Sequence, residues 1–284
     1  IHRGPDDSGT FVDVSTNTSI GMSMRRLSII DLKQGNQPIF SDDGNLVIVF
    51  NGEIYNYLEL KKILKNDYNL KFKTSSDTEV ILKLYEIYQE KGFHLLDGMY
   101  AFSIFDKKLN KVIIARDYFG EKPLYYYMID DKFYWASELK SIIKVIENKP
   151  KICKQGLSLY FQLTYIPSPY TIYENIKKLE ADHYLEIDLN KFNIKKFEIK
   201  KEKKIKDENQ ISFNDAKQKT FDLVMKSVKS RAVSDVPVGA FLSGGVDSSI
   251  ISLCHSLNQT NKIDTFSLGF KNKSFDESKK FRTV

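Results

Sequence analysis

A phosphate-binding turn is indicated by residues 241–250, which read Phe-Leu-Ser-Gly-Gly-Val-Asp-Ser-Ser-Ile. Apolar residues at 238–242 predict a strand, and those at 250–257 recur at helical spacing, so the turn should open a helix. Backbone N–H groups and the positive end of the dipole at a helix start favour a phosphate. Gly244 and Gly245 would let the backbone approach the ligand closely. Because no Gly-x-x-x-x-Gly-Lys-Ser/Thr sequence occurs, the site would differ from a Walker loop.

A simpler interpretation of this turn is a buried strand, a glycine turn and an ordinary Asp or Ser helix cap. Four polar residues, Ser243, Asp247, Ser248 and Ser249, are more than a cap requires, so we favour the phosphate site. Residues 265–270 predict the next buried strand. The strand, helix, strand order predicts the start of a parallel α/β domain, with its ligand at the carboxyl ends of the strands.

Five short motifs in the first 150 residues combine charged, amide and glycine residues. They are His-Arg-Gly-Pro-Asp-Asp-Ser-Gly at 2–9, Arg-Leu-Ser-Ile-Ile-Asp at 26–31, Phe-Asn-Gly-Glu-Ile-Tyr-Asn at 50–56, Ser-Asp-Thr-Glu at 76–79 and Ala-Arg-Asp-Tyr-Phe-Gly-Glu-Lys-Pro-Leu-Tyr at 115–125. Their order and content resemble the glutaminase domain of class II glutamine amidotransferases, specifically that of the glutamine-hydrolysing asparagine synthetases. The turn at 243–248 resembles the Ser-Gly-Gly-x-Asp-Ser pyrophosphatase loop that follows this domain in the same family.

The resemblance implies a fold and a reaction. The fold is an α+β glutaminase domain of the layered αββα, N-terminal nucleophile hydrolase type, followed by the start of an α/β parallel-sheet domain of the ATP pyrophosphatase type. In the reaction, a ligase uses ammonia from glutamine, and ATP with Mg²⁺ activates aspartate as β-aspartyl-AMP for amidation to asparagine. The small-molecule partners would be glutamine, aspartate and ATP, and a homodimer is one assembly that the resemblance leaves open.

The family also implies roles for individual residues of the glutaminase domain. Asn51 and Gly52 match the side-chain amide and backbone N–H that hold the oxyanion, donors typically worth about 3 kcal/mol each. Arg26 matches the planar clamp on the α-carboxylate of glutamine, and Asp77 matches the acid that binds its α-amino group. The remaining residues of the implied glutamine pocket are Leu27, Ser28, Ile29, Ile30 and Glu53.

In the second domain, the resemblance implies an ATP site with Asp247 as the Mg²⁺ ligand. Mg²⁺ favours one or two carboxylates together with phosphate oxygens, which fits this assignment. The implied ATP-binding residues are Leu242, Ser243, Gly244, Gly245, Asp247, Ser248 and Leu268.

Each pocket residue also has an interpretation without function. Asn51-Gly52 is the dipeptide most typical of a tight turn after a strand, and a turn would itself expose both donors. Asp77 could compensate the dipole of a helix whose capping box is Ser76 with Glu79. Arg26 could form a weak surface salt bridge with Asp31. The combination of motifs favours the functional roles.

The family's nucleophile is a cysteine at the N-terminus, whose free α-amino group acts as the base, whereas this sequence starts at Ile1. Cys153 and Cys254 cannot replace it and are expected to be reduced packing residues. We therefore expect the sequence to be an internal part of a longer gene product that is inactive by itself. The alternatives are an amidotransferase for another carboxylate, such as a sugar acid in polysaccharide synthesis, and a non-catalytic remnant.

The elements that must position these motifs follow from apolar periodicity. Strands are expected at 46–50, 99–105, 112–115, 123–129 and 133–136, and helices at 78–91 and 213–231. The expected domains are 1–150 for the glutaminase, 151–210 for a connector and 211–284 for the start of the ATP-binding domain.

Composition limits the class of protein. The chain has 284 residues, of which 42% are hydrophobic and 13% aromatic, enough to fill the cores of two domains. The net charge of +6 is concentrated in the lysine-rich stretch 191–206, which a solvated hairpin or connector explains. No nucleic-acid partner is expected, since no recognised nucleic-acid module accompanies the charge. The sequence contains no run of 18 apolar residues that could span a membrane, so a cytoplasmic location is expected. The four histidines lack the spacing of zinc ligands, so no zinc site is expected.

Overall fold

We describe a computed structural model of the chain over residues 2–14, 18–199, 211–260, 262–274 and 276–283. The chain divides into two compact units, Ile1–Glu202 and Lys203–Val284. Each unit has its own strands and helices.

A six-stranded antiparallel sheet forms the centre of the first unit. Its order is β11 (Asn193–Glu198), β10 (His183–Asp188), β6 (Lys111–Arg116), β5 (Gly98–Asp106), β4 (Leu46–Ile54) and β3 (Ile39–Phe40). The apolar runs of β4 and β5 are buried on both faces because other layers cover the sheet on each side. The expected strands at 46–50, 99–105 and 112–115 are thereby confirmed.

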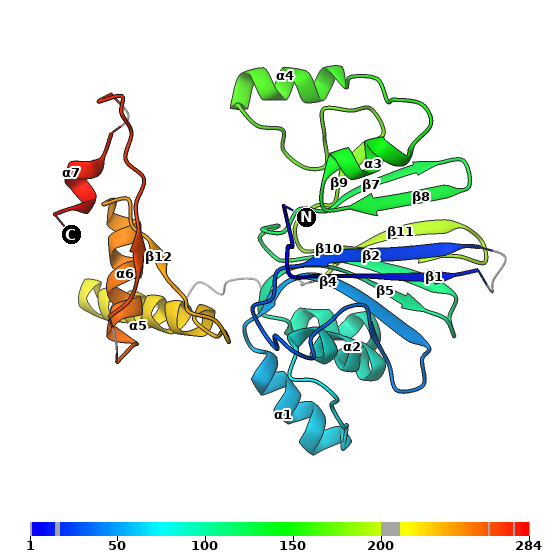
Figure 1. The fold of residues 1–284 in the computed structure, drawn as a ribbon, viewed down its shortest axis with the longest axis horizontal. Helices are drawn as coiled ribbons and strands as arrows, with labels where there is room; N and C mark the ends of the chain where they lie inside the picture. The colour runs from blue at the N-terminus through cyan, green and yellow to red at the C-terminus, as the bar shows by residue number, and fades with distance from the viewer. Residues whose placement is uncertain (1, 15–17, 200–210, 261, 275, 284) are drawn as a thin grey trace. The chain divides into compact units, whose positions relative to one another are not determined.

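The layers around this sheet give the αββα arrangement that the resemblance implies (Figure 1). Helices α1 (Tyr57–Tyr68) and α2 (Asp77–Tyr88) cover one face. The other face packs against β1 (Asp7–Asp13) and β2 (Ile20–Arg26) through a buried cluster that includes Met22, Val47 and Phe105. A three-stranded sheet of β8 (Lys132–Ala136), β7 (Tyr125–Ile129) and β9 (Ile176–Lys178) follows, with α3 (Leu139–Val145) packed on it.

Residues 151–199 belong to the first unit and do not form the expected connector. They contribute helix α4 (Lys154–Leu163) and strands β9, β10 and β11. Leu185 of β10 lies opposite Ile114 of β6, so this segment extends the central sheet. Local sequence patterns do not reveal this pairing, because the partners lie about 70 positions apart and β10 carries charged residues on its more exposed side.

Helix α2 starts with a cap that differs from the expected capping box. The Ser76 hydroxyl accepts a hydrogen bond from the N–H of Thr78, at 3.1 Å. The Glu79 carboxylate bonds to the backbone N–H groups of Lys73 and Thr74, at 2.9 and 2.7 Å, instead of returning to Ser76. The α-helix ends at Tyr88, and a 3-10 helix, η1 (Gln89–Leu95), continues through the expected stop at Gly92.

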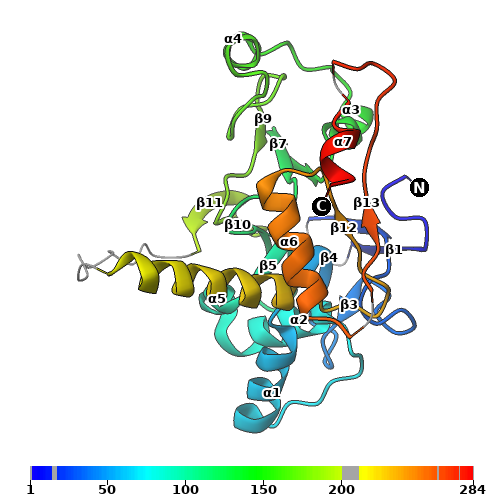
Figure 2. The same ribbon diagram turned by 90° about the vertical axis from the view of Figure 1, so that its left-hand side faces the viewer.

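The second unit contains the expected strand, helix, strand order (Figure 2). Helix α5 (Phe213–Arg231) precedes β12 (Ala240–Phe241), α6 (Val246–Leu257), β13 (Thr265–Phe266) and the short α7 (Ser278–Phe281). Strands β12 and β13 pair in parallel, as expected. The expectation of a buried strand at 265–270 is wrong, because the strand is short and α6 packs against β12, leaving Phe266 and Leu268 exposed.

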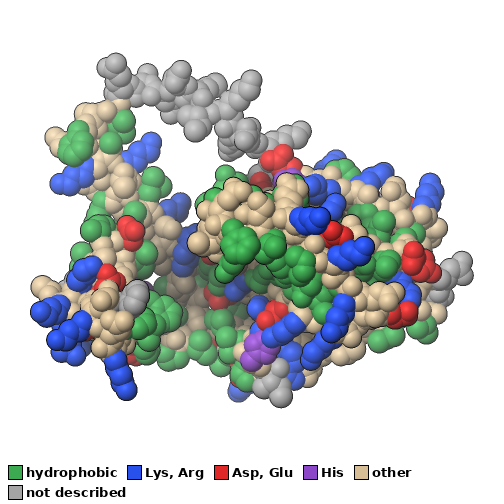
Figure 3. All heavy atoms as spheres, turned by 90° about the horizontal axis from the view of Figure 1, so that it is seen from above, with side chains coloured by type: hydrophobic (Ala, Val, Ile, Leu, Met, Phe, Trp, Pro, Cys, Tyr) green, Lys and Arg blue, Asp and Glu red, His purple; other side chains and the backbone are tan. Residues whose placement is uncertain are grey.

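Charged side chains are spread over the surface in several places, as the face in Figure 3 shows. Residues 191–198 of the lysine-rich stretch form the loop and the second strand of the hairpin β10–β11, one of the two expected forms, and residues 200–206 lie outside the described part. Among the described residues, no helix combines the length and apolar character needed to cross a membrane.

Candidate functional site

The residues predicted to bind glutamine gather around one hollow of about 190 Å³ in the first unit. Eight of the nine line it, and they come from the segment after β2, from β4 and from the start of α2. These eight are Arg26, Leu27, Ile29, Ile30, Asn51, Gly52, Glu53 and Asp77. Ser28 is the exception, because it does not line the hollow; it is half-buried, and its N–H donates to the Asp6 carboxylate at 2.8 Å.

Asn51 and Gly52 lie within strand β4 and not in a turn, so the turn interpretation is wrong. They are paired with Ala101 and Tyr100 of β5, and this pairing carries the strand on to Ile54. Glycine is required at position 52 because a Cβ would lie 2.0 Å from the carbonyl oxygen of Met99. Asn51 and Gly52 therefore line the hollow from an extended strand, β4, paired closely with β5.

The side chain of Asn51 lies between two hollows. It lines the glutamine-pocket hollow and a larger one of about 630 Å³ on the β1–β2 side of β4. Its Nδ2 atom donates to the Ser137 hydroxyl at the long distance of 3.5 Å. An amide donor held this weakly remains available to a ligand oxygen.

Arg26 is only 5% exposed, and its guanidinium organises the segment that follows β2. Nη2 donates to the carbonyl oxygens of Ile30 and Asp31, each at 2.8 Å, and Nη1 donates to the Asn36 side-chain oxygen at 3.0 Å. These acceptors are uncharged, so they satisfy N–H groups without neutralising the cation. A positive charge beside the hollow therefore remains for an anionic group.

Asp77 is the first residue of α2, lines the hollow and is only 5% exposed. One carboxylate oxygen accepts a hydrogen bond from the N–H of Ile54, at 3.0 Å. Burial raises the pKa of Asp77 to about 6, and the nearby Glu53 charge adds to the effect. The pKa of Glu53 is raised as well, again by burial. A cation beside these two carboxylates would stabilise their ionised forms, so the pair suits an ammonium group.

Two residues of this hollow were missed from the sequence. The Gln37 side chain accepts from the N–H of Phe50 at 2.7 Å and donates to the Thr78 hydroxyl at 3.2 Å, so it ties β4 to α2 next to Asn51. Lys122 lines the hollow and lowers the pKa of Glu53 against the effect of burial. Lys122 lies in a quoted motif, whereas nothing in the local sequence marks Gln37, because its partners are distant in the chain.

The turn between β12 and α6 in the second unit has the expected strand, turn, helix form. Gly244 has a φ of +78°, and a Cβ there would lie 2.5 Å from the backbone nitrogen of Phe281, so only glycine fits. Gly245 is the residue before the helix, which leaves the first N–H groups of α6 without a cap from an Asp or Ser at this position.

Hydroxyl groups cluster on this turn. The Ser243 and Ser248 oxygens lie 3.0 Å apart, and the Ser248 and Ser249 hydroxyls donate back to the Gly245 carbonyl. The glycine backbone, the N–H groups at the start of α6 and the hydroxyl groups together fit a phosphate. The Ser267 hydroxyl donates to the Leu242 carbonyl at 2.6 Å, joining the carboxyl ends of β12 and β13, while Leu268 is exposed.

Asp247 lies in the first turn of α6 and is the carboxylate closest in sequence to the turn. It lines a hollow of about 690 Å³ shared with apolar residues of α5, β12 and α6. Within the described ranges, no group of three or more His, Cys, Asp or Glu side chains forms a metal cluster. A single carboxylate is compatible with Mg²⁺, which takes its other ligands from water and phosphate.

Comparison with protein families assigns both units. Residues 1–198 match the family described as glutamine amidotransferase domain, and residues 219–284 match the family described as asparagine synthase.

The chain belongs to the glutamine amidotransferase family.

The resemblance stated from the motifs is thereby confirmed, and so is the αββα fold class of this amidotransferase.

Relatives of this amidotransferase resemble it over nearly its whole length. Asparagine synthetases [glutamine-hydrolyzing] 1 and 2 of Bacillus subtilis are 40% and 36% identical over 98% and 99% of the chain, and over 42% and 38% of their own lengths. A Methanocaldococcus jannaschii protein, named only provisionally as asparagine synthetase 2, is 44% identical over 100% of the chain and 57% of its own length. The chain thus spans about half the length of the curated relatives it matches.

Among solved structures, glutamine phosphoribosylpyrophosphate amidotransferase from B. subtilis superposes with a TM-score of 0.49 and 17% identity. The superposition covers 96% of this amidotransferase and 61% of that chain.

Neither cysteine of this amidotransferase lines the hollows beside Asn51. The Cys153 sulfur accepts a hydrogen bond from the N–H of Gly156, at 3.3 Å, and so caps α4. Cys254 is buried in α6. Both are unpaired thiols with a packing or capping role, as expected.

Proposed function

We propose that the first unit binds glutamine and releases its amide nitrogen as ammonia, which the second unit uses to amidate aspartate to asparagine with AMP formation. The observation that carries this proposal is the hollow between β4 and α2. It is flanked by a buried cation and a buried anion, the two charges of an α-amino acid, with Asn51 and Gly52 on its wall.

Each group of the proposed substrate has a matching group in the hollow. The α-ammonium group would lie against Asp77 and Glu53. Burial raises the pKa of both carboxyl groups, and the ammonium charge would offset this effect by stabilising their ionised forms. The α-carboxylate would face Arg26. The amide carbon would lie beside Asn51 and Gly52. Their N–H donors would stabilise the negative oxygen that forms when the N-terminal cysteine implied by the family resemblance adds to this carbon, before the C–N bond breaks and ammonia leaves.

The second half of the proposal rests on the turn before α6. When bound, ATP with Mg²⁺ supplies the activation of a carboxylate with release of AMP and pyrophosphate. Ser243, Gly244, Gly245 and Ser248 would hold the phosphates, and Asp247 would hold the metal. The names of the relatives favour aspartate as the acceptor over a sugar acid. Because the chain spans about half of those relatives, the experiments below use the complete gene product.

Arg26→Lys and Asp77→Asn should each raise the KM for glutamine about ten- to a hundredfold, since each removes a charge-assisted contact of roughly 1.5–3 kcal/mol. Synthesis from added ammonia should be unchanged. Arg116→Lys is a matched control, because Arg116 is also buried and donates to backbone carbonyls but does not line the hollow. It should cost stability without changing this KM. An unchanged KM in both pocket variants would remove the glutamine site.

Glutamine use should depend on pH in a defined direction. The raised pKa of Asp77, about 6, means that its carboxylate is protonated and neutral below that pH and charged above it. Glutamine binding should therefore weaken on acidification, and the KM should rise by up to about tenfold per pH unit below pH 6. Steady-state glutamate release between pH 5 and 8 measures this effect. Asp77→Asn should flatten the profile, and a wild-type KM independent of pH would contradict the role of Asp77.

A further inference from the structure

Asp31 connects the two elements that hold the charges of the glutamine pocket, although it does not itself line the hollow. It is 9% exposed and has a φ of +52°, in the left-handed region that favours Gly, Asn and Asp. Its carboxylate accepts from the N–H of Gln34 at 2.9 Å and from the N–H of Ser75 at 2.6 Å. Ser75 lies two residues before Asp77.

On one side, Asp31 is fixed to the proposed carboxylate clamp. Its carbonyl oxygen accepts from Nη2 of Arg26 at 2.8 Å and from the N–H of Gly35 at 3.0 Å. The backbone and the side chain of one residue therefore hold the guanidinium and the segment that leads to α2. Because the carbonyl and the carboxylate belong to one residue with a left-handed backbone, Arg26 and Ser75 have little freedom to move relative to each other.

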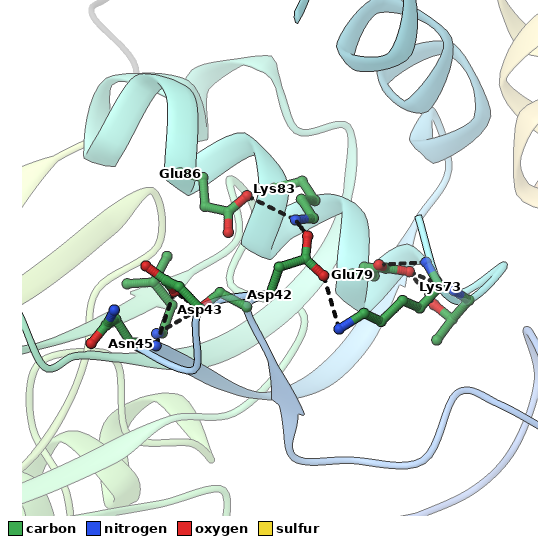
Figure 4. A network of polar contacts seen from close by, with 10 residues as sticks. Asp42, Asp43, Asn45, Lys73, Glu79, Lys83 and Glu86 are labelled. Atoms are coloured by element: carbon green, nitrogen blue, oxygen red, sulfur yellow. Dashed lines mark hydrogen bonds and ion pairs between the residues drawn. The ribbon is translucent and has the colours of Figure 1, made fainter. Parts of the chain in front are cut away.

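On the other side, hydrogen bonds hold the segment before α2 in place. Glu79 accepts from the N–H groups of Lys73 and Thr74 and from the Thr74 hydroxyl, at 2.9, 2.7 and 2.6 Å. Lys61 donates to the carbonyl of Thr74 at 2.7 Å. Figure 4 shows Glu79 beside Lys73, whose ammonium group also pairs with Asp42 at 2.8 Å. Since Ser75 is joined to the start of α2 by only one residue, a displacement of Ser75 would also displace Asp77.

We propose that Asp31 is a positioning residue that sets the spacing between the Arg26 and Asp77 charges, and so tunes the pocket to an α-amino acid carrying both charges on one carbon. This inference rests on the proposed glutamine site. Asp31 touches no substrate. It acts by tying the segment after β2 to the segment before α2, two parts of the chain about 44 positions apart that share the pocket.

The test is steady-state glutamine kinetics of Asp31→Gly in the complete gene product. Glycine adopts the left-handed backbone without steric cost and removes the carboxylate; the backbone freedom that it adds is shared by the control Asp106→Gly. The KM for glutamine should rise about tenfold while kcat and ammonia-dependent synthesis stay within a factor of about three. Asp31→Asn, which keeps one acceptor oxygen, should restore only part of the affinity, with a KM about three- to fivefold above that of wild type. It also provides the measurement if the glycine variant does not fold, and a KM within about twofold of wild type would then overturn the inference.

Asp106→Gly is the matched structural control. Asp106 is also buried and accepts from a backbone N–H, that of Leu109, at 3.0 Å, but it lies at the opposite end of β5 from the residue paired with Asn51. A merely structural role for Asp31 predicts that both variants lower kcat, by reducing the folded fraction, and leave KM unchanged. That result would overturn the inference. If Asp31→Gly leaves KM unchanged while Asp77→Asn raises it, the glutamine site stands and only the role of Asp31 falls.

Discussion

Asp247→Asn should stop asparagine synthesis from free ammonia as well as from glutamine in the complete gene product. Asp247 lies in the first turn of α6, beside the Ser-Gly-Gly turn that would hold the ATP phosphates. Loss of a metal-binding carboxylate removes several kcal/mol of charge stabilisation, so we expect turnover with either nitrogen source to fall at least about a hundredfold. Release of AMP and pyrophosphate with aspartate, measured with each nitrogen source in turn, reports the loss.

Asp215→Asn is the control for this variant. Asp215 also lies in the first turn of a helix, α5, near its positive end, but it is exposed and does not line the hollow that Asp247 lines. Its replacement should cost a few tenths of a kcal/mol of stability and leave synthesis intact. Should Asp247→Asn keep ammonia-dependent turnover within a factor of about three, the turn is an ordinary helix start and no metal-phosphate site.

Asn51→Ala should lower kcat for glutamine hydrolysis by roughly 10² to 10³ with little change in KM, since the amide donor acts on the oxygen only as charge develops on it. The structure supports an available donor. The one side-chain contact of the Asn51 amide within the described residues is the 3.5 Å hydrogen bond to Ser137, and the amide faces two hollows. Ammonia-dependent synthesis should be unaffected. Glutamate release under saturating glutamine provides the measurement.

Asn56→Ala separates this role from a general effect of losing an asparagine near β4. The Asn56 side chain donates to the Leu95 carbonyl and accepts from the N–H of Asp97, at 2.9 and 3.0 Å, so its contacts are structural. We expect that variant to lose stability by about 1 kcal/mol for each bond and to keep its kcat. An unchanged kcat in Asn51→Ala would exclude the oxyanion role.

Local patterns in the sequence were sufficient to place the main elements of the site. The apolar runs of β4 and β5 gave both strands, and the stripe along α2 gave the helix. The motifs around Arg26, Asn51 and Asp77, more than 50 positions apart at their extremes, converge on one hollow. That convergence followed from the family resemblance, because no local propensity indicates which strand lies beside which helix.

Long-range pairing accounts for what the sequence did not reveal. Asn51-Gly52 is typical of a turn, yet pairing with Ala101 and Tyr100 keeps it extended, so tertiary contact overrides local preference. Strand β10 was not predicted, and its segment was expected to be a connector, because its partner β6 is also distant in the sequence. Glu79 fitted a capping box, but the chain before α2 folds back and offers it the N–H groups of Lys73 and Thr74 instead.

Transfer of the glutamine amide nitrogen tests the proposed coupling most directly. The complete gene product would be supplied with ATP, Mg²⁺, aspartate and glutamine labelled with heavy nitrogen at its side-chain amide, and the products identified by mass spectrometry. We predict labelled asparagine, formed in equal amount with AMP and pyrophosphate, and loss of the label from asparagine in Asp77→Asn when unlabelled ammonia is also present. Label that never enters asparagine, or nucleotide cleavage to ADP and phosphate, would contradict the proposed function.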